Sequence, residues 1–241
     1  MDTIEKQYPV MPLKNTVLFP QQVIPIYVGR KKSLKLIEDL DPDNKYLVVV
    51  AQQDGSVEDP KEQDLYSYGT LALVLKTFDM PDNSKSAIVQ GVDRVKILKY
   101  EEGNDYFIAD VERIPESITT PDVQVEALAK SLKNSFTELI KISPNLNEEH
   151  AGMLSNIDRP SRLADRATSL LSVSNSEKQE VLEELDIKKR VEIAINLLQK
   201  EIQRIKLGEE IQTEVQDEIS KTQREYYLRE QMKTIQKELG E

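Results

Sequence analysis

The chain has 241 residues, enough for one large or two ordinary domains whose cores need neither disulfides nor metals. Cysteine is absent, which excludes a disulfide framework, a thiolate zinc site and a cysteine nucleophile. The net charge is −11 and both halves of the chain are acidic, so neither half offers the clustered basic face that nucleic-acid binding needs.

Apolar runs are short throughout the sequence. The stretches 46–51 and 71–75 fall far below the roughly 20 residues that cross a bilayer, so no membrane span is expected. Residues 1–8 alternate acidic and basic side chains around no apolar centre, unlike a secretory signal peptide. A cytoplasmic location is the expectation.

Residues 9–114 form short β-branched runs separated by turn residues, which predicts a strand-rich domain. Four prolines lie in the first of these runs, so we expect this segment to be an edge, a bulge or an irregular crossing. One helix is predicted at 31–40, and turn residues at 80–84 and 102–104 predict hairpins. The expected strands are 10–13, 17–19, 23–28, 46–51, 71–78, 86–90, 92–98 and 107–113.

After Ile114 the apolar residues repeat with the period of a helix, which predicts a boundary near residues 115–121. We expect a helix that Thr120 caps and Pro121 begins, a second after Asp158, and a third behind a Ser174–Glu177 capping box. Each has one apolar stripe, so they should pack together as a bundle. The residues expected to face inward are Val125, Leu128, Leu132, Phe136, Leu139, Leu163, Ala167, Leu170, Leu171, Val181, Leu182 and Leu185.

A single very long helix, or two nearly collinear ones, is predicted from Ile187 to Leu239, where only Gly208 interrupts the pattern. Its heptad runs are out of phase with one another. A helix of ~50 residues would extend ~75 Å, so it should find partners outside its own fold. The expected class is α+β: a β-rich domain at 1–116, a helical bundle at 117–205, and the rest of a coiled-coil-like helix at 206–241.

No catalytic residue and no metal ligand set is expected. The eight glycines form no phosphate-binding G-x-x-x-x-G-K-[ST] pattern, and the one histidine, His150, falls in a predicted interhelical loop. Carboxylate pairs such as Glu183 and Glu184 are adjacent in sequence and fit a solvated face. Counting residues leaves only a serine–lysine pair open, and nothing marks a serine as activated.

Several strings of the sequence resemble the N-terminal part of the bacterial Lon protease family. They are PVMPLKNTVLFPQQVIPIYVGR from Pro9 to Arg30, LVVVAQ from Leu47, DLYSYGT from Asp64, RLAD from Arg162, and QREYYLREQMKTIQKELGE from Gln223 to Glu241. The chain differs from the commonest family sequence at Met11, at Gln21–Gln22 and in the 79–83 turn. The resemblance covers nearly the whole chain, and its last string is the most specific.

This resemblance implies a non-catalytic substrate-recognition and assembly module with a PUA-like β fold, which gathers unfolded, damaged or degron-tagged proteins. Family members form hexameric rings. In them an ATPase module, which holds ATP and Mg, and then a protease domain with a Ser–Lys dyad follow where this chain stops. The chain itself is therefore expected to hold no cofactor.

Two groups of residues are candidates for contact with an exposed apolar segment. One group lies in turns and comprises Phe19, Pro20, Phe78, Met80 and Pro81, which alternatively only close the bottom of the β domain. The other lies on the long helix, where packing between neighbouring subunits is favoured over direct substrate contact. It comprises Tyr226, Tyr227, Leu228, Met232 and Ile235.

Two other classes of function remain open. The chain is alternatively a structural spacer that oligomerises through the long helix and touches no substrate. A nucleic-acid-binding module is the third hypothesis, since PUA-like folds often hold RNA and some family members bind DNA. The acidic balance argues against it.

Overall fold

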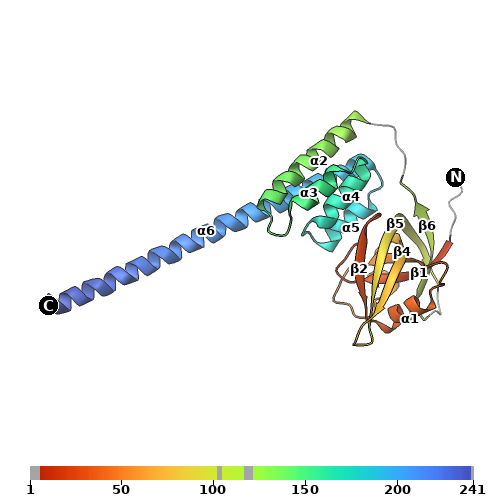
Figure 1. Cartoon of the computed structure of the whole chain (residues 1–241), viewed down its shortest axis with the longest axis horizontal. Coiled ribbons are helices and arrows are strands. Elements are labelled where there is room, and N and C mark those ends of the chain that lie inside the picture. The colour runs from red at the N-terminus through yellow and green to blue at the C-terminus, as the bar shows by residue number, and fades with distance from the viewer. Residues whose placement is uncertain (1–5, 102–104, 117–121, 240–241) are drawn as a thin grey trace.

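The computed structural model describes residues 6–101, 105–116 and 122–239. A β-rich lobe, a helical lobe and one projecting helix follow one another along the chain (Figure 1). The predicted α+β class is confirmed, with strands first and helices after them.

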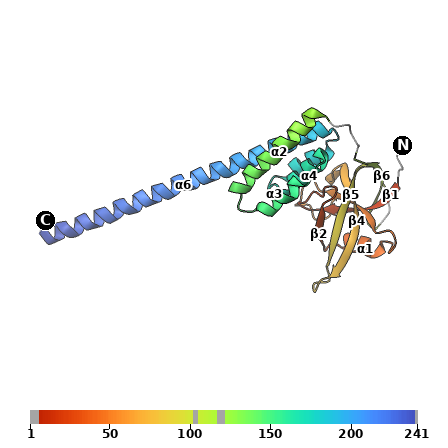
Figure 2. The same ribbon diagram turned by 45° about the horizontal axis from the view of Figure 1, so that its top comes forward.

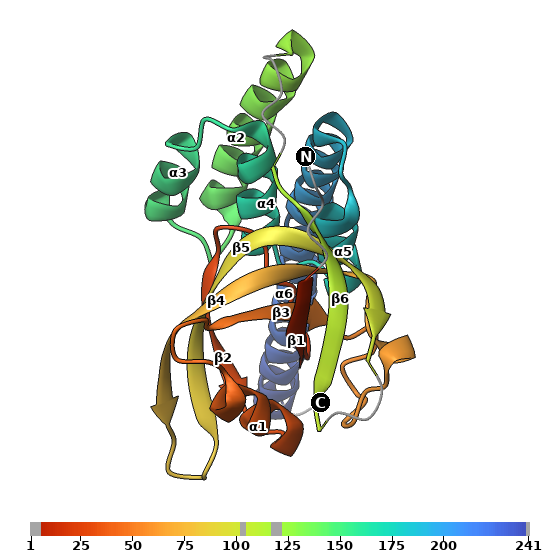
Figure 3. The same cartoon turned by 90° about the vertical axis from the view of Figure 1, so that its right-hand side faces the viewer.

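Six strands build the β-rich lobe: β1 (Lys6–Leu13), β2 (Val23–Val28), β3 (Tyr46–Ala51), β4 (Tyr68–Asp79), β5 (Lys85–Tyr100) and β6 (Phe107–Ile114). Their order is β2-β5-β4-β3-β1-β6, and a further pairing of β5 with β6 closes five strands into a barrel (Figure 3). Only β1 and β3 pair in parallel among the described residues. Strand β2 borders β5 alone in this part of the chain, which suits an edge strand that contains Pro25.

β1 lies between β3 and β6, but among the described residues Pro9 pairs only with Ile108 of β6 and Pro12 only with Val50 of β3. Each proline thus has one unpaired side, as its missing amide hydrogen requires.

Two other predictions for these strands are wrong. The predicted strands 86–90 and 92–98 are one continuous strand. At Gly91 this strand passes close to the loop at 17–19, and a Cβ atom added to Gly91 would lie 2.3 Å from the Phe19 carbonyl oxygen. Residues 17–19 form that loop, where the Thr70 hydroxyl donates to the Leu18 carbonyl at 2.5 Å.

Helix α1 (Lys31–Asp39) lies at one end of the barrel, as predicted to within one residue (Figure 1). Its Leu36 is 1% exposed and packs with Ile37 on an apolar cluster that includes Met11 and Leu47. A second apolar cluster, which includes Val95 and residues of β6, takes the alternate residues of β1 and β3 and so lies on the opposite face of these two strands. The barrel is therefore a packed core.

Four helices precede the long one: α2 (Val123–Ile142), α3 (Glu148–Ser155), α4 (Pro160–Leu170) and α5 (Asn175–Glu183). Asp122 caps α2; Thr120 and Pro121, predicted to begin this helix, lie outside the described residues. Pro160 begins α4, and the Ser174–Glu177 capping box begins α5, both as predicted. Their apolar faces form one cluster, and most of the residues predicted to face inward are buried in it.

Two expectations for the helical lobe are wrong. His150 is not in a loop: it lies in the first turn of α3, where its ring accepts from the Asn147 amide in a capping box. Leu185 is 43% exposed, because α5 ends at Glu183 and Leu185 falls in the short link to the next helix.

Helix α6 runs unbroken from Ile187 to Leu239 and passes Gly208 without interruption. Its first part packs along α2 and α4, and the remainder projects away from both lobes by about 50 Å (Figure 2). Among the described helices, α6 included, none has an apolar stretch of the length needed to cross a membrane.

The two lobes share one core and a set of polar contacts. Val17, Phe19 and Ala51 of the β-rich lobe belong to the apolar cluster of the helices. Arg94 of β5 forms a buried ion pair with Asp165 of α4, and its Nε donates to the Leu182 carbonyl at 3.0 Å. These contacts join β5 to α4 and α5 and make one packed unit of the lobes.

Glu116 lies in the connection between the lobes and bonds to the first turn of α4. Its Oε2 accepts from Arg159 and Arg162, each at 3.0 Å, and its Oε1 accepts from the Ser161 hydroxyl. Burial acts to raise the pKa of Glu116, but these three donors outweigh it and lower the pKa from its ordinary 4.5. The carboxylate therefore stabilises the fold above pH 4.5, and this contribution is lost as the pH falls through the lowered pKa of the folded state.

We expect Glu116→Gln to lower the free energy of unfolding at neutral pH by about 1 kcal/mol, because a charge-assisted acceptor is lost. The difference should shrink as the pH falls through the lowered pKa of Glu116 and vanish once the wild-type carboxyl group is also protonated. Urea unfolding at several pH values measures it. A difference that stays constant with pH would show that the glutamate charge is not the cause.

Candidate functional site

Exposed apolar side chains gather around the β4–β5 hairpin, which extends past the barrel (Figure 3). Its turn at 80–84 is tight, with Asn83 in the left-handed conformation and the Met80 amide bonded to the Ser84 carbonyl at 2.9 Å. The members are 41–68% exposed and form the surface that we call the hairpin patch: Val23, Tyr27, Leu75, Phe78 and Met80.

Strand pairing places members of the hairpin patch in one row. Tyr27 and Phe78 both pair with Ser86, from opposite sides, so the three side chains share one face of the sheet. Leu75 is the extra residue of a β-bulge, and bulges re-aim side chains. The patch therefore takes its residues from β2, β4 and the hairpin tip, with Ser86 of β5 between the two rings.

Polar contacts hold the two aromatic rings of the patch. The Tyr27 hydroxyl donates to Asp82 at 3.0 Å, and the Lys76 ammonium group lies 4.7 Å from the centre of the Phe78 ring. Hydrogen bonds from Ser84, and then from Tyr27, lower the pKa of Asp82, so this acceptor stays ionised at neutral pH. The rings are thus held in place with much of their surface exposed.

The structure separates the predicted turn residues. Phe78, Met80 and Pro81 lie exposed at the hairpin tip. Phe19 is 1% exposed within the cluster that joins the lobes, so the prediction that it is an exposed contact residue is wrong. Pro20 beside it is half-buried.

Val23 and Tyr27 were missed by the sequence analysis. The signal for them was present, because an edge strand with one buried face exposes alternate residues, and VIPIYV alternates in this way.

The projecting part of α6 carries a second exposed apolar surface, which we call the helix stripe. Its members, all 45–68% exposed, include the five residues predicted on the long helix. Residues spaced four apart in a helix are rotated by ~40° about its axis, so the stripe covers more than one face of α6. Such a surface suits more than one partner helix. The members are Leu207, Ile211, Val215, Ile219, Tyr226, Tyr227, Leu228, Met232 and Ile235.

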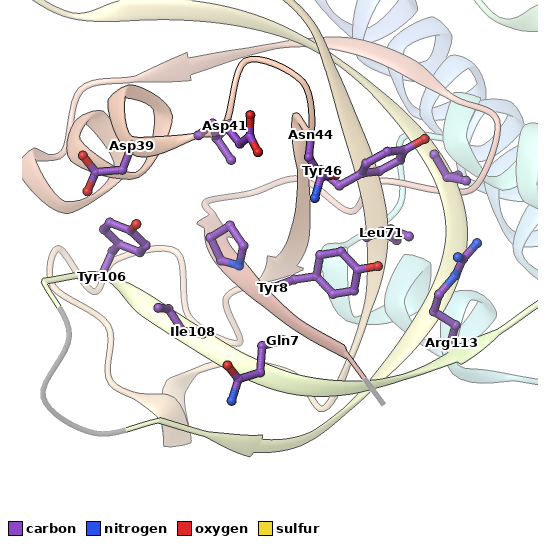
Figure 4. A pocket seen from close by; sticks show the side chains of 13 residues that line it. Gln7, Tyr8, Asp39, Asp41, Asn44, Tyr46, Leu71, Tyr106, Ile108 and Arg113 are labelled. Carbon is purple, nitrogen blue, oxygen red and sulfur yellow. The ribbon is translucent and has the colours of Figure 1, made fainter. Parts of the chain in front are cut away.

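A cleft that the sequence did not predict lies on the barrel beside the end of α1 (Figure 4). Its volume is about 530 Å³, and it is lined by Tyr8, Tyr46 and Tyr106 and, at one end, by Arg113. Arg113 is paired with Asp93, and that hydrogen bond raises the pKa of the guanidinium. Burial, together with Asp39, raises the pKa of the Tyr106 phenol. Aromatic faces beside fixed charges can hold a ligand.

The described part of the chain contains no group of three or more His, Cys, Asp or Glu side chains that could hold a metal ion. His150 is engaged in capping α3. The hairpin patch and the helix stripe are exposed apolar surfaces, and such surfaces are typical of sites that bind other proteins.

Comparison with known proteins identifies the family. Residues 7–200 match the model of the ATP-dependent protease La (LON) substrate-binding domain. The chain is 43% identical over 234 residues to the Lon protease of Koribacter versatilis and 39% identical over 238 residues to that of Dictyoglomus thermophilum. These matches cover 97% and 99% of this chain but only 29% and 30% of the relatives, so the chain spans about a third of their length.

Two solved structures have the same fold. The N-terminal domain of a Mycobacterium avium complex Lon protease superposes with a TM-score of 0.66 at 22% identity, over 80% of this chain and 98% of that one. A Lon N-terminal domain protein from Xanthomonas campestris gives 0.56 at 18% identity, over 78% and 95%. The chain therefore belongs to the Lon protease family, and residues 7–200 are its substrate-binding domain.

Proposed function

We propose that this chain captures exposed apolar segments of unfolded, damaged or degron-tagged proteins through the hairpin patch. The observation that carries the proposal is the row formed by Tyr27 and Phe78, with Met80 at the adjoining tip. A folded protein buries its large apolar side chains, so such a surface distinguishes unfolded chains from folded ones. Methionine at the tip adapts to segments of different shape.

We further propose that the captured protein is degraded by other parts of a longer protein. Relatives named Lon protease are about three times as long as this chain. The additional length would hold an ATPase module with ATP and Mg and a protease domain with a Ser–Lys dyad, in a cytoplasmic hexamer. The chain itself supplies recognition and assembly.

The double variant Phe78→Ser/Met80→Ser should bind unfolded protein about tenfold more weakly, because the apolar area buried against the segment is lost. Fluorescence anisotropy with labelled lactalbumin, reduced and carboxymethylated to keep it unfolded, measures the affinity. Native lactalbumin should bind neither the wild-type chain nor the variant.

Val123→Ser provides the matched control for the hairpin variant. Val123 is 80% exposed at the start of α2 and lies outside the patch, so its replacement removes exposed apolar area elsewhere. Its affinity should equal that of the wild-type chain. Equal binding by the hairpin variant and the wild-type chain would contradict the proposal.

Self-association through α6 is a second candidate function, favoured by the helix stripe. Its apolar residues lie on a helix that continues about 50 Å beyond the lobes, a geometry that suits packing against other helices. In this case the hairpin variant would leave capture unchanged, and breaking α6 would abolish assembly.

A further inference from the structure

A small cavity lies between the start of α1, the loop at 58–60 and the start of β6; it is apart from the hairpin patch and shares only Tyr106 with the cleft of Figure 4. We call it the α1 cavity. Its volume of about 330 Å³ is at the small end of the roughly 300–1,000 Å³ typical of ligand pockets. Its walls are largely apolar and are formed by Val10, Pro12, Leu36, Pro60 and Phe107.

The first turn of α1 forms one side of the α1 cavity and offers free hydrogen-bond donors. The helix has nine residues, and Arg30 at its N-cap position supplies no capping side chain. The amides of Lys31, Lys32 and Ser33 find no acceptor among the described residues. Free amides and the positive end of the helix dipole favour an anionic group at this place.

Ser33 gives an independent indication of a ligand. It lines the α1 cavity and is only 8% exposed, yet its hydroxyl has no hydrogen-bond partner within residues 6–101, 105–116 and 122–239. The hydroxyl is accessible rather than sealed in the core, so an oxygen acceptor in the cavity can reach it. The Ser33 hydroxyl and the three first-turn amides can therefore donate hydrogen bonds to the oxygen atoms of one bound group.

The charges around the α1 cavity leave a net positive edge. Glu58 and Asp59 also line it, but Lys14 binds the first at 2.6 Å and Lys32 binds the second at 2.8 Å, and these hydrogen bonds lower both pKa values. Arg30 is held by Gln52 at 2.5 Å. Lys31 lines the cavity with no ion-pair partner in the part of the chain that the structure describes, so its charge is available to an anion.

We propose that the α1 cavity binds the C-terminal carboxylate of a protein whose last residue is apolar. The carboxylate would accept from the first-turn amides and the Ser33 hydroxyl beside Lys31, while the last side chain fills the apolar walls. A free phosphate fits poorly, because the walls would strip its water without replacing those hydrogen bonds. The proposal rests on the proposed function and adds to it a second, end-specific means of substrate recognition.

The test compares two labelled peptides of one sequence that end in leucine, one with a free carboxylate and one with a C-terminal amide. Anisotropy with the whole chain should show the amide binding about tenfold more weakly, because the charge-assisted hydrogen bonds are lost. Ser33→Ala should weaken binding of the acid about threefold, the loss of one neutral hydrogen bond, while thermal stability is kept.

Lys31→Glu should weaken binding of the acid about tenfold without harm to the fold. An acidic residue in the first turn favours a helix but repels a bound carboxylate, so a loss of affinity cannot be attributed to unfolding. Lys221→Glu makes the same change of charge on the exposed, distant part of α6 and should leave the affinity unchanged.

Two results would overturn the proposal: equal binding of the acid and amide peptides, or equal weakening of acid binding by Lys31→Glu and Lys221→Glu. The hairpin variant separates this proposal from the proposed function. Phe78→Ser/Met80→Ser should keep the preference for the acid peptide while capture of unfolded protein is lost. If both are lost together, the α1 cavity is not an independent site.

Discussion

Asp165→Ala is expected to lower the free energy of unfolding by about 3–5 kcal/mol, the usual effect of removing one partner from a buried ion pair. The side chains of Arg94 and Asp165 are only 7% and 5% exposed. Arg190 lies close by, at 4% exposure. Burial, and then the neighbouring Arg94, lower the pKa of Arg190 to about 10, while Asp165 opposes them. Without Asp165, two buried guanidinium groups would face one another with only the weaker influence of Glu184 and Glu116 to offset them.

Urea unfolding at neutral pH measures this loss. The double variant Arg94→Met/Asp165→Leu should be more stable than Asp165→Ala alone, because it removes both buried charges and fills the space with apolar groups. If Asp165→Ala costs no more than an ordinary surface substitution, within about 0.5 kcal/mol, the pair does not hold the lobes together.

Proline placed at two positions of α6 should give opposite results. Leu198 is fully buried against the helical lobe, so Leu198→Pro should lose about 3 kcal/mol from the helix and more from the disrupted core, enough to unfold this lobe. Ile219 is 45% exposed in the projecting part, where every described residue beyond Lys206 except Glu230 is exposed. Ile219→Pro should therefore leave the Tm of the lobes unchanged.

Calorimetry measures Tm, and far-UV circular dichroism reports the helix lost in each variant. The concentration dependence of Tm adds a test of the helix stripe. If α6 packs against other copies, Tm of the wild-type chain rises with concentration and that of Ile219→Pro does not. An equal fall of Tm in both proline variants would show that the projecting part stabilises the lobes after all.

The sequence predicted the features that local rules determine. Helix α1, the capping box at Ser174 and the unbroken α6 follow from periodicity, capping and the absence of proline, which act within a few residues. The hairpin tip followed from its turn residues in the same way, and Phe78 and Met80 are indeed exposed there.

Errors arose where distant segments decide the outcome. Residues 17–19 have the composition of a strand, but the surface that covers them comes from helices far along the chain, so Phe19 is buried rather than exposed at a turn. The sequence likewise gave no reason to connect Arg94 with Asp165, since only the packing of β5 on α4 brings them together. The α1 cavity was missed because its lining comes from four separate segments.

The pairing of β1 with β6 has a consequence for synthesis on the ribosome. The partner of β1 on one side, β3, is synthesised soon after it, whereas the partner on the other side is Phe107–Ile114. The helices that bury the loop at 17–19 are synthesised later still. Because these contacts join segments that are distant in sequence, closure of the barrel is expected to be slow. The nascent chain therefore displays an open β1 edge until Phe107–Ile114 has emerged, and until then this edge can pair with other chains unless a chaperone covers it.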